Sequence, residues 1–239
     1  MIDRITPTQR PKEKPVGYQS WRSLLFMHWP VPAQQLRPLV PASLEIDTHG
    51  GVAYVGLIPF AMQHVRPWWA PKALGFNFLE TNVRTYVTHG DRPGVYFLSL
   101  DAASRIGVWT ARTFWGLPYY HAKMSLQHND DTVQYHSTRS GSRAQLNAAC
   151  RLGETLPPSA PDSLEFFFLE RYLLFLEQRD QPYCGQVHHT PYPAQLAEIL
   201  TLDDQLLAAA GFPGCSGLPT FTHFSSGVDV EIFGLQAVS

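Results

Sequence analysis

The amino-acid sequence predicts a mainly β (α+β) fold with a few short helices, in which largely antiparallel strands form a closed or nearly closed barrel. Three observations support this fold class. Hydrophobic residues make up 44% of the 239 residues and charged residues only 16%, a balance that favours a buried core over disorder. The aromatic share of 13% and the 20 prolines are typical of short strands joined by tight turns. Apolar and polar residues also alternate with a period of two in several segments.

In chain order, residues 1–15 are polar and proline-rich and are expected to form an extended arm, with residues 16–239 as a single domain. Short helices are predicted over 33–39, which prolines flank, over 163–171, where Asp162 or Ser163 can cap the start, and over 203–210, which Gly211 ends. Strands are predicted at 18–29, 51–62, 78–89, 95–100, 108–114, 119–128, 132–138, 142–150, 173–178, 184–189, 195–202 and 228–236.

The clearest hairpin joins 78–89 to 95–100 through the turn Gly90–Gly94. Residues 66–77 contain two prolines and the pair Trp68 and Trp69, and they are predicted to form a loop. We expect the tryptophans to pack this loop onto the core. The alternative is an exposed loop that acts as a lid or as an oligomer contact.

The segment 119–126 follows the turn Trp115–Pro118 and carries most of the candidate chemistry. Strand alternation places Tyr119, His121 and Lys123 on one face and Tyr120 on the other. One face of a single strand therefore presents a phenol, an imidazole and an amine. These four residues are the catalytic candidates. The alternatives are a solvated face and a histidine with a purely structural hydrogen bond.

The strand predicted at 78–89 places Glu80, Asn82, Arg84 and Tyr86 on one face. Glu80 and Arg84 are about 13 Å apart by strand rise, too far for a direct ion pair, so each needs partners from neighbouring strands. Inside a barrel this face lines a pocket, and on the outside it is ordinary surface charge.

The sequence also argues against several classes of function. The net charge is -2 with no basic block, which disfavours nucleic acid. No run approaches the ~20 apolar residues of a membrane span, and no nucleotide-binding motif suggests a cofactor. Cys150, Cys184 and Cys215 are expected to be reduced thiols, in keeping with a cytoplasmic protein without a signal peptide. His188 and His189 point to opposite faces of a strand, so no metal site is expected.

Several segments together resemble the YqjF-like family of uncharacterised proteins over nearly the whole chain. They are FLETNVRTYV (78–87), SLD (99–101), GLPYYHAKM (116–124), LERY (169–172), VHHTPYP (187–193) and SSGVDV (225–230). That family is similar to the acetoacetate decarboxylase superfamily. The segment LRPLVPASLEID (36–47) also resembles the segment that follows the first strand in acetoacetate decarboxylases. The resemblance implies a cone-shaped β-barrel with flanking antiparallel strands and a few helices, and a homo-oligomer.

Acetoacetate decarboxylases form a Schiff base between a lysine and the substrate carbonyl. A second, adjacent lysine lowers the pKa of the first. By resemblance, Tyr119 and Tyr120 occupy those two positions, so decarboxylase activity is not expected. The resemblance also places the family's active-site arginine at Arg22 and one of its glutamates at Glu80, with Arg84 as a further ligand-binding candidate. Lys123 is the alternative imine lysine, although it lies four residues beyond Tyr119.

Three functions remain open. In the first, the barrel binds a small keto, carboxylate or partly apolar ligand. In the second, it is an enzyme of the lyase or isomerase type that uses tyrosine or histidine acid-base chemistry on a small carbonyl compound without an imine. In the third, it is a structural, oligomeric scaffold whose interior is filled by side chains. A cavity lined by Glu80 and Tyr119 would argue against the scaffold. We expect these two residues to converge on one internal cavity with His121 and Arg22.

Overall fold

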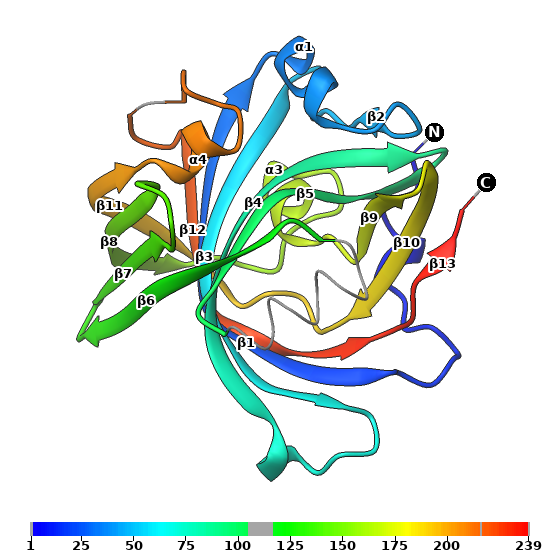
Figure 1. Cartoon of the computed structure of the whole chain (residues 1–239), viewed down its shortest axis with the longest axis horizontal. Helices are drawn as coiled ribbons and strands as arrows, with labels where there is room; N and C mark the ends of the chain where they lie inside the picture. Colours follow the sequence, from blue (N-terminus) through cyan, green and yellow to red (C-terminus); the bar gives the residue numbers. More distant parts are fainter. Residues whose placement is uncertain (1, 105–116, 216, 239) are drawn as a thin grey trace.

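The computed structural model describes residues 2–104, 117–215 and 217–238. In this part of the chain, thirteen strands form a single sheet, which confirms the mainly β fold class (Figure 1). The strands are β1 (Gly17–Val31), β2 (Glu45–Ile46), β3 (Ala53–Pro67), β4 (Phe76–His89), β5 (Arg92–Ala102), β6 (Tyr119–Asn129), β7 (Thr132–Arg139), β8 (Gln145–Thr155), β9 (Leu173–Gln178), β10 (Gln181–His188), β11 (Ala194–Asp204), β12 (Phe221–Ile232) and β13 (Gln236–Ala237).

The helical segments are short. They are α1 (Ala33–Leu36), α3 (Leu164–Leu169), α4 (Leu206–Ala209) and the 3-10 turns η1 (Thr6–Thr8), η2 (Arg37–Leu39) and η3 (Lys72–Leu74). The predicted cap of α3 is confirmed, because the Ser163 hydroxyl accepts a hydrogen bond from the Phe166 amide at 3.1 Å. In this part of the chain no helix is long and apolar enough to span a bilayer.

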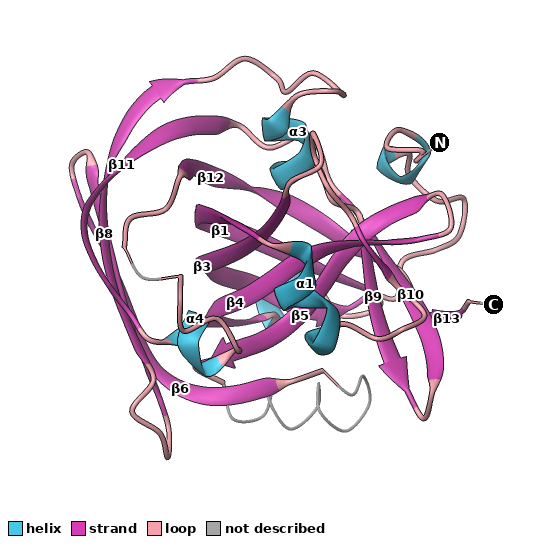
Figure 2. Ribbon diagram, turned by 90° about the horizontal axis from the view of Figure 1, so that it is seen from above, coloured by secondary structure: helices cyan, strands magenta, loops and turns pink. Residues whose placement is uncertain are grey.

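The sheet closes on itself in two rings that share strands. The first ring runs β4, β5, β9, β10, β12, β1 and β3, and the pairing of β10 with β12 closes it. The second ring leaves β5 through β6, β7, β8 and β11 and returns to β12. Figure 2 shows β8 and β11 on one side of the shared strands and β9 and β10 on the other. The pairs β5–β6 and β5–β9 are parallel, and the other paired strands are antiparallel.

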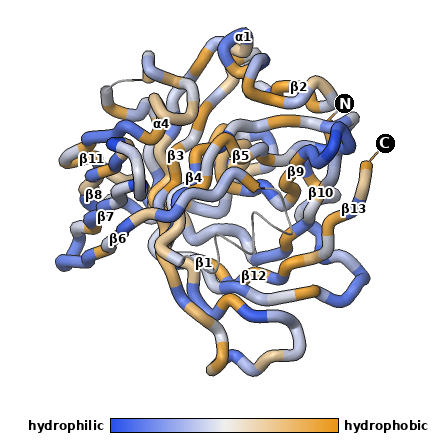
Figure 3. Tube along the Cα trace, in the orientation of Figure 1, coloured by the Kyte–Doolittle hydropathy of each residue, from blue (hydrophilic) through white to orange (hydrophobic). Residues whose placement is uncertain are grey.

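The shared strands are buried on both faces, which explains the continuous apolar run in β1. Leu25 and Met27 pack into the second ring, together with residues of β7, β8 and α4. Leu24 and Phe26 point the other way, into the first ring with residues of α3. Figure 3 shows the hydrophobic residues along β1, β3 and β4, whereas the outer β6–β7 turn is hydrophilic.

Several element boundaries differ from the predicted ones for local reasons. Pro30 does not end β1. At Pro30 the strand still pairs with β3 but no longer with β12, so the missing amide donor of the proline breaks no hydrogen bond on the side where β12 pairs earlier in the strand. The predicted helix at 203–210 is shorter. β11 extends to Asp204, whose carboxylate then accepts the Leu206 and Leu207 amides at the start of α4. The strand predicted at 108–114 lies outside the described residues.

The loop between β3 and β4 corrects one expectation. Trp68 and Trp69 are 62% and 69% exposed, so they do not pack the loop onto the core.

The N-terminal arm is held against the domain by two ion pairs. Arg4 makes a bidentate pair with the buried Asp47 at 2.8 Å, and Arg10 pairs with Glu231 at 2.6 Å.

Candidate functional site

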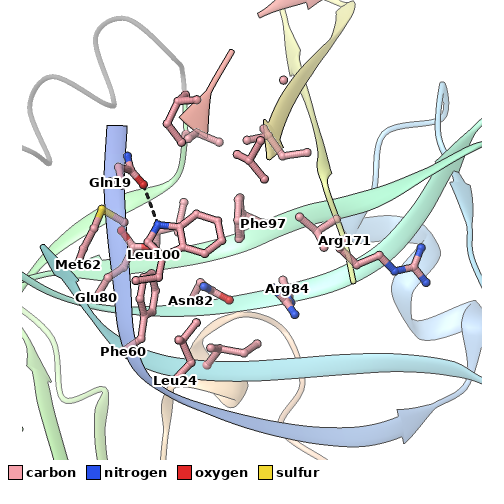
Figure 4. A pocket seen from close by; sticks show the side chains of 18 of the residues that line it. Gln19, Leu24, Phe60, Met62, Glu80, Asn82, Arg84, Phe97, Leu100 and Arg171 are labelled. Carbon is pink, nitrogen blue, oxygen red and sulfur yellow. Dashed lines mark hydrogen bonds between the residues drawn. The ribbon is translucent and has the colours of Figure 1, made fainter. Parts of the chain in front are cut away.

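The first ring contains a partly open cavity of about 380 Å³, a size in the range of small-molecule sites. Its walls come from β1, β3, β4, β5, β9, β10 and β12, together with the start of β6. The lining is mostly apolar and rich in rings, including Trp21, Phe60, Phe76, Phe78, Phe97 and Tyr192. The polar side chains labelled in Figure 4 that interrupt it are Gln19, Glu80, Asn82, Arg84 and Arg171.

Glu80 and Tyr119 form a hydrogen-bonded pair at one end of this cavity. The Tyr119 hydroxyl donates to Glu80 Oε2 at 2.7 Å, and Glu80 is only 3% exposed. Burial raises the pKa of Glu80 to about 7, against the opposing hydrogen bond from Tyr119 and with a further contribution from Asp101. Burial and the neighbouring carboxylate raise the pKa of Tyr119 well above its ordinary value. Near neutral pH, Glu80 is therefore poised to gain or lose a proton while Tyr119 keeps its proton.

The pair depends on the join between β4, β5 and β6. Leu100 of β5 is the register partner of Tyr119, and Ala102 is the partner of both Glu80 and His121. Between Leu100 and Ala102 lies the buried Asp101, whose carboxylate accepts two hydrogen bonds from the Arg139 guanidinium of β7, at 2.7 and 2.8 Å, in a bidentate ion pair. Arg139 also lies 3.9 Å from the centre of the Tyr120 ring. This ion pair ties β5 to β7 and holds β6 between them.

Asn82 and Arg84 continue the cavity face of β4, as the alternation predicted. Figure 4 shows Glu80, Asn82 and Arg84 in this order along the cavity. Asn82 is 4% exposed, its Oδ1 atom is buried without a hydrogen-bond partner, and its amide forms no side-chain hydrogen bond with a described residue. The Arg84 guanidinium donates to the Phe168 carbonyl at 2.9 Å and to the Tyr86 hydroxyl at 3.4 Å, but its Nε atom is buried and unpaired.

Arginines gather at the Arg84 end of the cavity. The guanidinium carbons of Arg84 and Arg171 lie 5.6 and 5.0 Å from the centre of the same Tyr86 ring. Arg171 shares the carboxylate of Asp47 with Arg4, at 2.8 Å in each case. Burial lowers the pKa of Arg171 to about 10, so it remains charged at neutral pH. Arg84 forms no ion pair with any described residue.

Arg22 does not join Glu80, so the expected convergence is wrong at this residue. Arg22 is absent from the cavity lining, and its guanidinium pairs with Asp229 and the Val228 carbonyl of β12. The physical reason is an irregularity in β1. Ser23 has a φ of 53°, and the register between β1 and β3 shifts after Arg22. A count without gaps along a regular strand cannot detect this change of direction.

Tyr120, His121 and Lys123 also lie outside the cavity lining. Tyr120 packs on Arg139, and the His121 Nδ1 atom lies 2.8 Å from the Ser140 hydroxyl. Beyond His121, β6 pairs only with β7 and follows the second ring, which carries Lys123 to an exposed position. The other lysines, Lys12, Lys14 and Lys72, are exposed as well, so no lysine of the chain lines the cavity.

Sequence reasoning did not single out Arg171. It lies in the segment LERY, which contributed to the resemblance, but its pairing with Asp47 spans 124 positions. Asn82 appeared in the alternation of β4 without a proposed role. In the described part of the chain, no three His, Cys, Asp or Glu side chains converge as metal ligands.

A family model described as an uncharacterized conserved protein, DUF2071, matches residues 18–229. The chain is 42% identical over 187 residues to the uncharacterized protein YqjF of Bacillus subtilis (strain 168), with 75% of each chain covered. Five of the segments that carry the predicted resemblance, at 78–87, 99–101, 116–124, 169–172 and 187–193, supply residues of the cavity wall.

Solved structures with the same fold are similar to the chain over almost its full length. An acetoacetate decarboxylase-like enzyme from Sphingomonas wittichii RW1 has a TM-score of 0.66 at 14% identity, covering 100% of this chain and 98% of its own. The enduracididine biosynthesis enzyme MppR, complexed with pyruvate, has a TM-score of 0.64 at 12% identity, covering 97% and 93%. At these identities the likeness confirms the acetoacetate decarboxylase-like fold.

Proposed function

The chain belongs to the DUF2071 family of uncharacterized conserved proteins, and we propose that it is a ligand-binding barrel for a small, largely apolar carbonyl compound. The observation that carries this proposal is the Glu80–Tyr119 pair at the wall of a mostly apolar cavity. Buried polar groups of this kind fix the orientation of a ligand whose remainder fills the apolar volume. The cavity also argues against a scaffold with a filled interior.

The pair supports recognition of a carbonyl oxygen. When Glu80 is protonated, its hydroxyl can donate to a ligand oxygen while Oε2 still accepts from Tyr119. A charged carboxylate in the same place would repel that oxygen. Because the pKa of Glu80 is about 7, we expect carbonyl ligands to bind more tightly at pH 6 than at pH 8.

Imine chemistry is not part of this proposal. A Schiff base needs an unprotonated amine beside the substrate carbonyl, and all four lysines of the chain are exposed. We therefore expect that borohydride treatment with acetoacetate forms no covalent adduct. A stoichiometric adduct mapped by mass spectrometry to Lys123 would overturn this part of the proposal.

A second candidate function is supported by the same pair. A buried carboxyl group with a pKa near 7 is suited to proton transfer at a carbon next to a carbonyl, and Tyr119 can stabilise the oxygen that gains charge. Such an enzyme would exchange the α-hydrogens of a bound ketone with solvent. Deuterium incorporation, followed by NMR in heavy water, separates catalysis from binding alone.

The binding proposal is tested by calorimetry with ketones and alkanes of equal length. Wild type should prefer the ketone by about fivefold, the effect of one hydrogen bond of about 1 kcal/mol. The double variant E80L/Y119F should lose this preference, and E154Q, an exposed glutamate on β8, should keep it. Equal binding of ketone and alkane by wild type, or no binding of either, would refute the proposal.

A further inference from the structure

The loop between β3 and β4 carries an exposed apolar tip, which consists of Trp68, Trp69, Leu74 and Phe76. All four side chains are between 46% and 73% exposed. Among the described residues, the other exposed large apolar side chains lie singly or in pairs along the chain. Figure 1 shows this loop projecting at the lower end of β3 and β4. An exposed cluster of large apolar side chains marks an interaction surface.

Backbone contacts hold the tip in place without packing it onto the core. The Trp68 amide donates a hydrogen bond to the Val16 carbonyl, which precedes β1, at 3.1 Å. A Cβ atom at Gly75 would lie 2.6 Å from the His64 Cα atom, so the two sides of the loop approach closely there. Because the loop is ordered before it meets a partner, little conformational entropy is lost when the tip binds.

The charge of the loop is positive. The segment 62–79 contains Arg66 and Lys72 and no aspartate or glutamate. Neither of these cations forms an ion pair with a described residue. Lys72 is close enough to Asp229 to act on its charge, but Asp229 is paired with Arg22. Basic side chains beside exposed aromatic ones fit a surface whose outer layer is anionic and whose interior is apolar.

The apolar tip is continuous with the cavity. Phe76 belongs to both, because it lines the cavity and is 46% exposed. Its ring stacks on the ring of Phe78, another lining residue, with the ring centres 5.7 Å apart. On the other side of the loop, Val65 of β3 also lines the cavity. An apolar surface therefore leads from the tip into the cavity.

We propose that the β3–β4 loop docks the protein on the surface of an anionic phospholipid bilayer. Trp68 and Trp69 lie at the level of the head groups, which amphipathic indole rings favour, and Arg66 and Lys72 contact the phosphates. This mode of binding needs no spanning segment, because the apolar side chains enter the bilayer by only about 5–10 Å. Docking goes beyond the proposed function and does not depend on it. It brings the cavity wall at Phe76 to the lipid, where apolar carbonyl compounds dissolve.

A second copy of the chain fits this face less well than lipid does. A symmetric dimer brings the same patch of both subunits together, so Arg66 and Lys72 would face their own counterparts. Like charges that face each other across an interface weaken it. Phospholipid supplies the opposite charge instead.

Sedimentation with lipid vesicles measures the docking. Vesicles of equal parts phosphatidylcholine and phosphatidylglycerol should bind wild type at least tenfold more tightly than vesicles of phosphatidylcholine alone. The reason is that each of the two cations contributes about fivefold near an anionic surface. Lipids with brominated acyl chains should quench the tryptophan fluorescence, which reports insertion of the tip and not only adsorption.

Two variants test the contributions of the tip and of its charge. W68S/W69S should weaken binding to the mixed vesicles at least tenfold and abolish the quenching, because it removes most of the apolar area that enters the bilayer. K72Q should weaken binding to the mixed vesicles about fivefold and leave binding to phosphatidylcholine unchanged. L218S and R143Q are the matched controls, since they remove an exposed leucine and an exposed arginine outside the loop, and they should change neither result. Thermal unfolding verifies that each variant is folded.

Equal binding of wild type and W68S/W69S to the mixed vesicles would refute the docking, as would no binding of wild type. If wild type does not bind vesicles but forms an assembly that W68S/W69S dissociates in sedimentation velocity, the tip contacts a second copy instead. The ketone preference of the proposed function is measured without vesicles, and neither tryptophan of the tip lines the cavity. Loss of docking with that preference intact would therefore refute this inference alone.

Discussion

The substitution E80Q should stabilise the protein at alkaline pH. Burial raises the pKa of Glu80 from 4.5 to about 7, so between these values the folded protein holds a proton that the unfolded chain has lost. Stability attributable to Glu80 is therefore fully present below pH 4.5 and is lost as the pH rises through 7. Glutamine is neutral at every pH, and its carbonyl oxygen can still accept the hydrogen bond from Tyr119.

The size of the effect follows from the pKa. Each pKa unit corresponds to about 1.4 kcal/mol, so ionising Glu80 in the folded protein costs about 3 kcal/mol relative to the unfolded chain. We expect the free energies of unfolding of wild type and E80Q to be similar at pH 4.5. By pH 8.5 the variant should be more stable than wild type by about 3 kcal/mol.

Urea denaturation of both proteins across this pH range measures the difference, because all other titrating groups are common to the two. Y119F provides an internal check. The Tyr119 hydrogen bond lowers the pKa of Glu80, so its loss should raise that pKa further and increase the alkaline destabilisation. A pH-independent difference between wild type and E80Q would show that Glu80 is ionised in the folded protein at its ordinary pKa, and would refute the reasoning.

Three further substitutions address the frame of the site. R139M leaves Asp101 buried without its cation and should cost about 3–5 kcal/mol of unfolding free energy by chemical denaturation, with most of this loss recovered in D101N/R139M. G56A places a methyl group 3.0 Å from the ring of His28 and should cost about 1–3 kcal/mol, whereas no loss would mean that the ring can move. W68S should change stability by less than about 0.5 kcal/mol, since this side chain is 62% exposed, and a larger loss would show that the loop does pack.

The part of the site on β4 could be predicted from the sequence because β4 pairs regularly with β3 from Phe78 to Thr85. Alternation then places Glu80, Asn82 and Arg84 on one face without further information. The sequence did not decide whether that face was inside or outside the barrel. That depends on the closure of β10 onto β12, a contact between segments more than 40 positions apart.

The errors at Arg22 and His121 share a physical origin. Alternation describes a regular strand, and both residues lie where a strand changes its partners or its direction. Arg22 precedes a left-handed residue in β1, and His121 is the last residue of β6 that pairs with β5. The ion pair of Arg171 with Asp47 could not be foreseen for a different reason, because neither local segment shows a pattern that refers to the other.

The same fold can support different chemistry because the residue beside the buried glutamate sets the charge of that glutamate. The resemblance predicts that Tyr119 and Tyr120 occupy the positions of the lysine pair of acetoacetate decarboxylases. An ammonium group within hydrogen-bonding distance would hold the Glu80 carboxylate ionised and lower its pKa. Tyr119 supplies one neutral hydrogen bond instead, which is too little to offset burial, so the pKa of Glu80 rises to about 7. On this correspondence, a phenol in place of the amine would remove the nucleophile and would also leave the neighbouring glutamate able to donate a proton near neutral pH. A likeness of fold at 14% identity carries over the barrel, whereas the reaction has to be argued from these side chains.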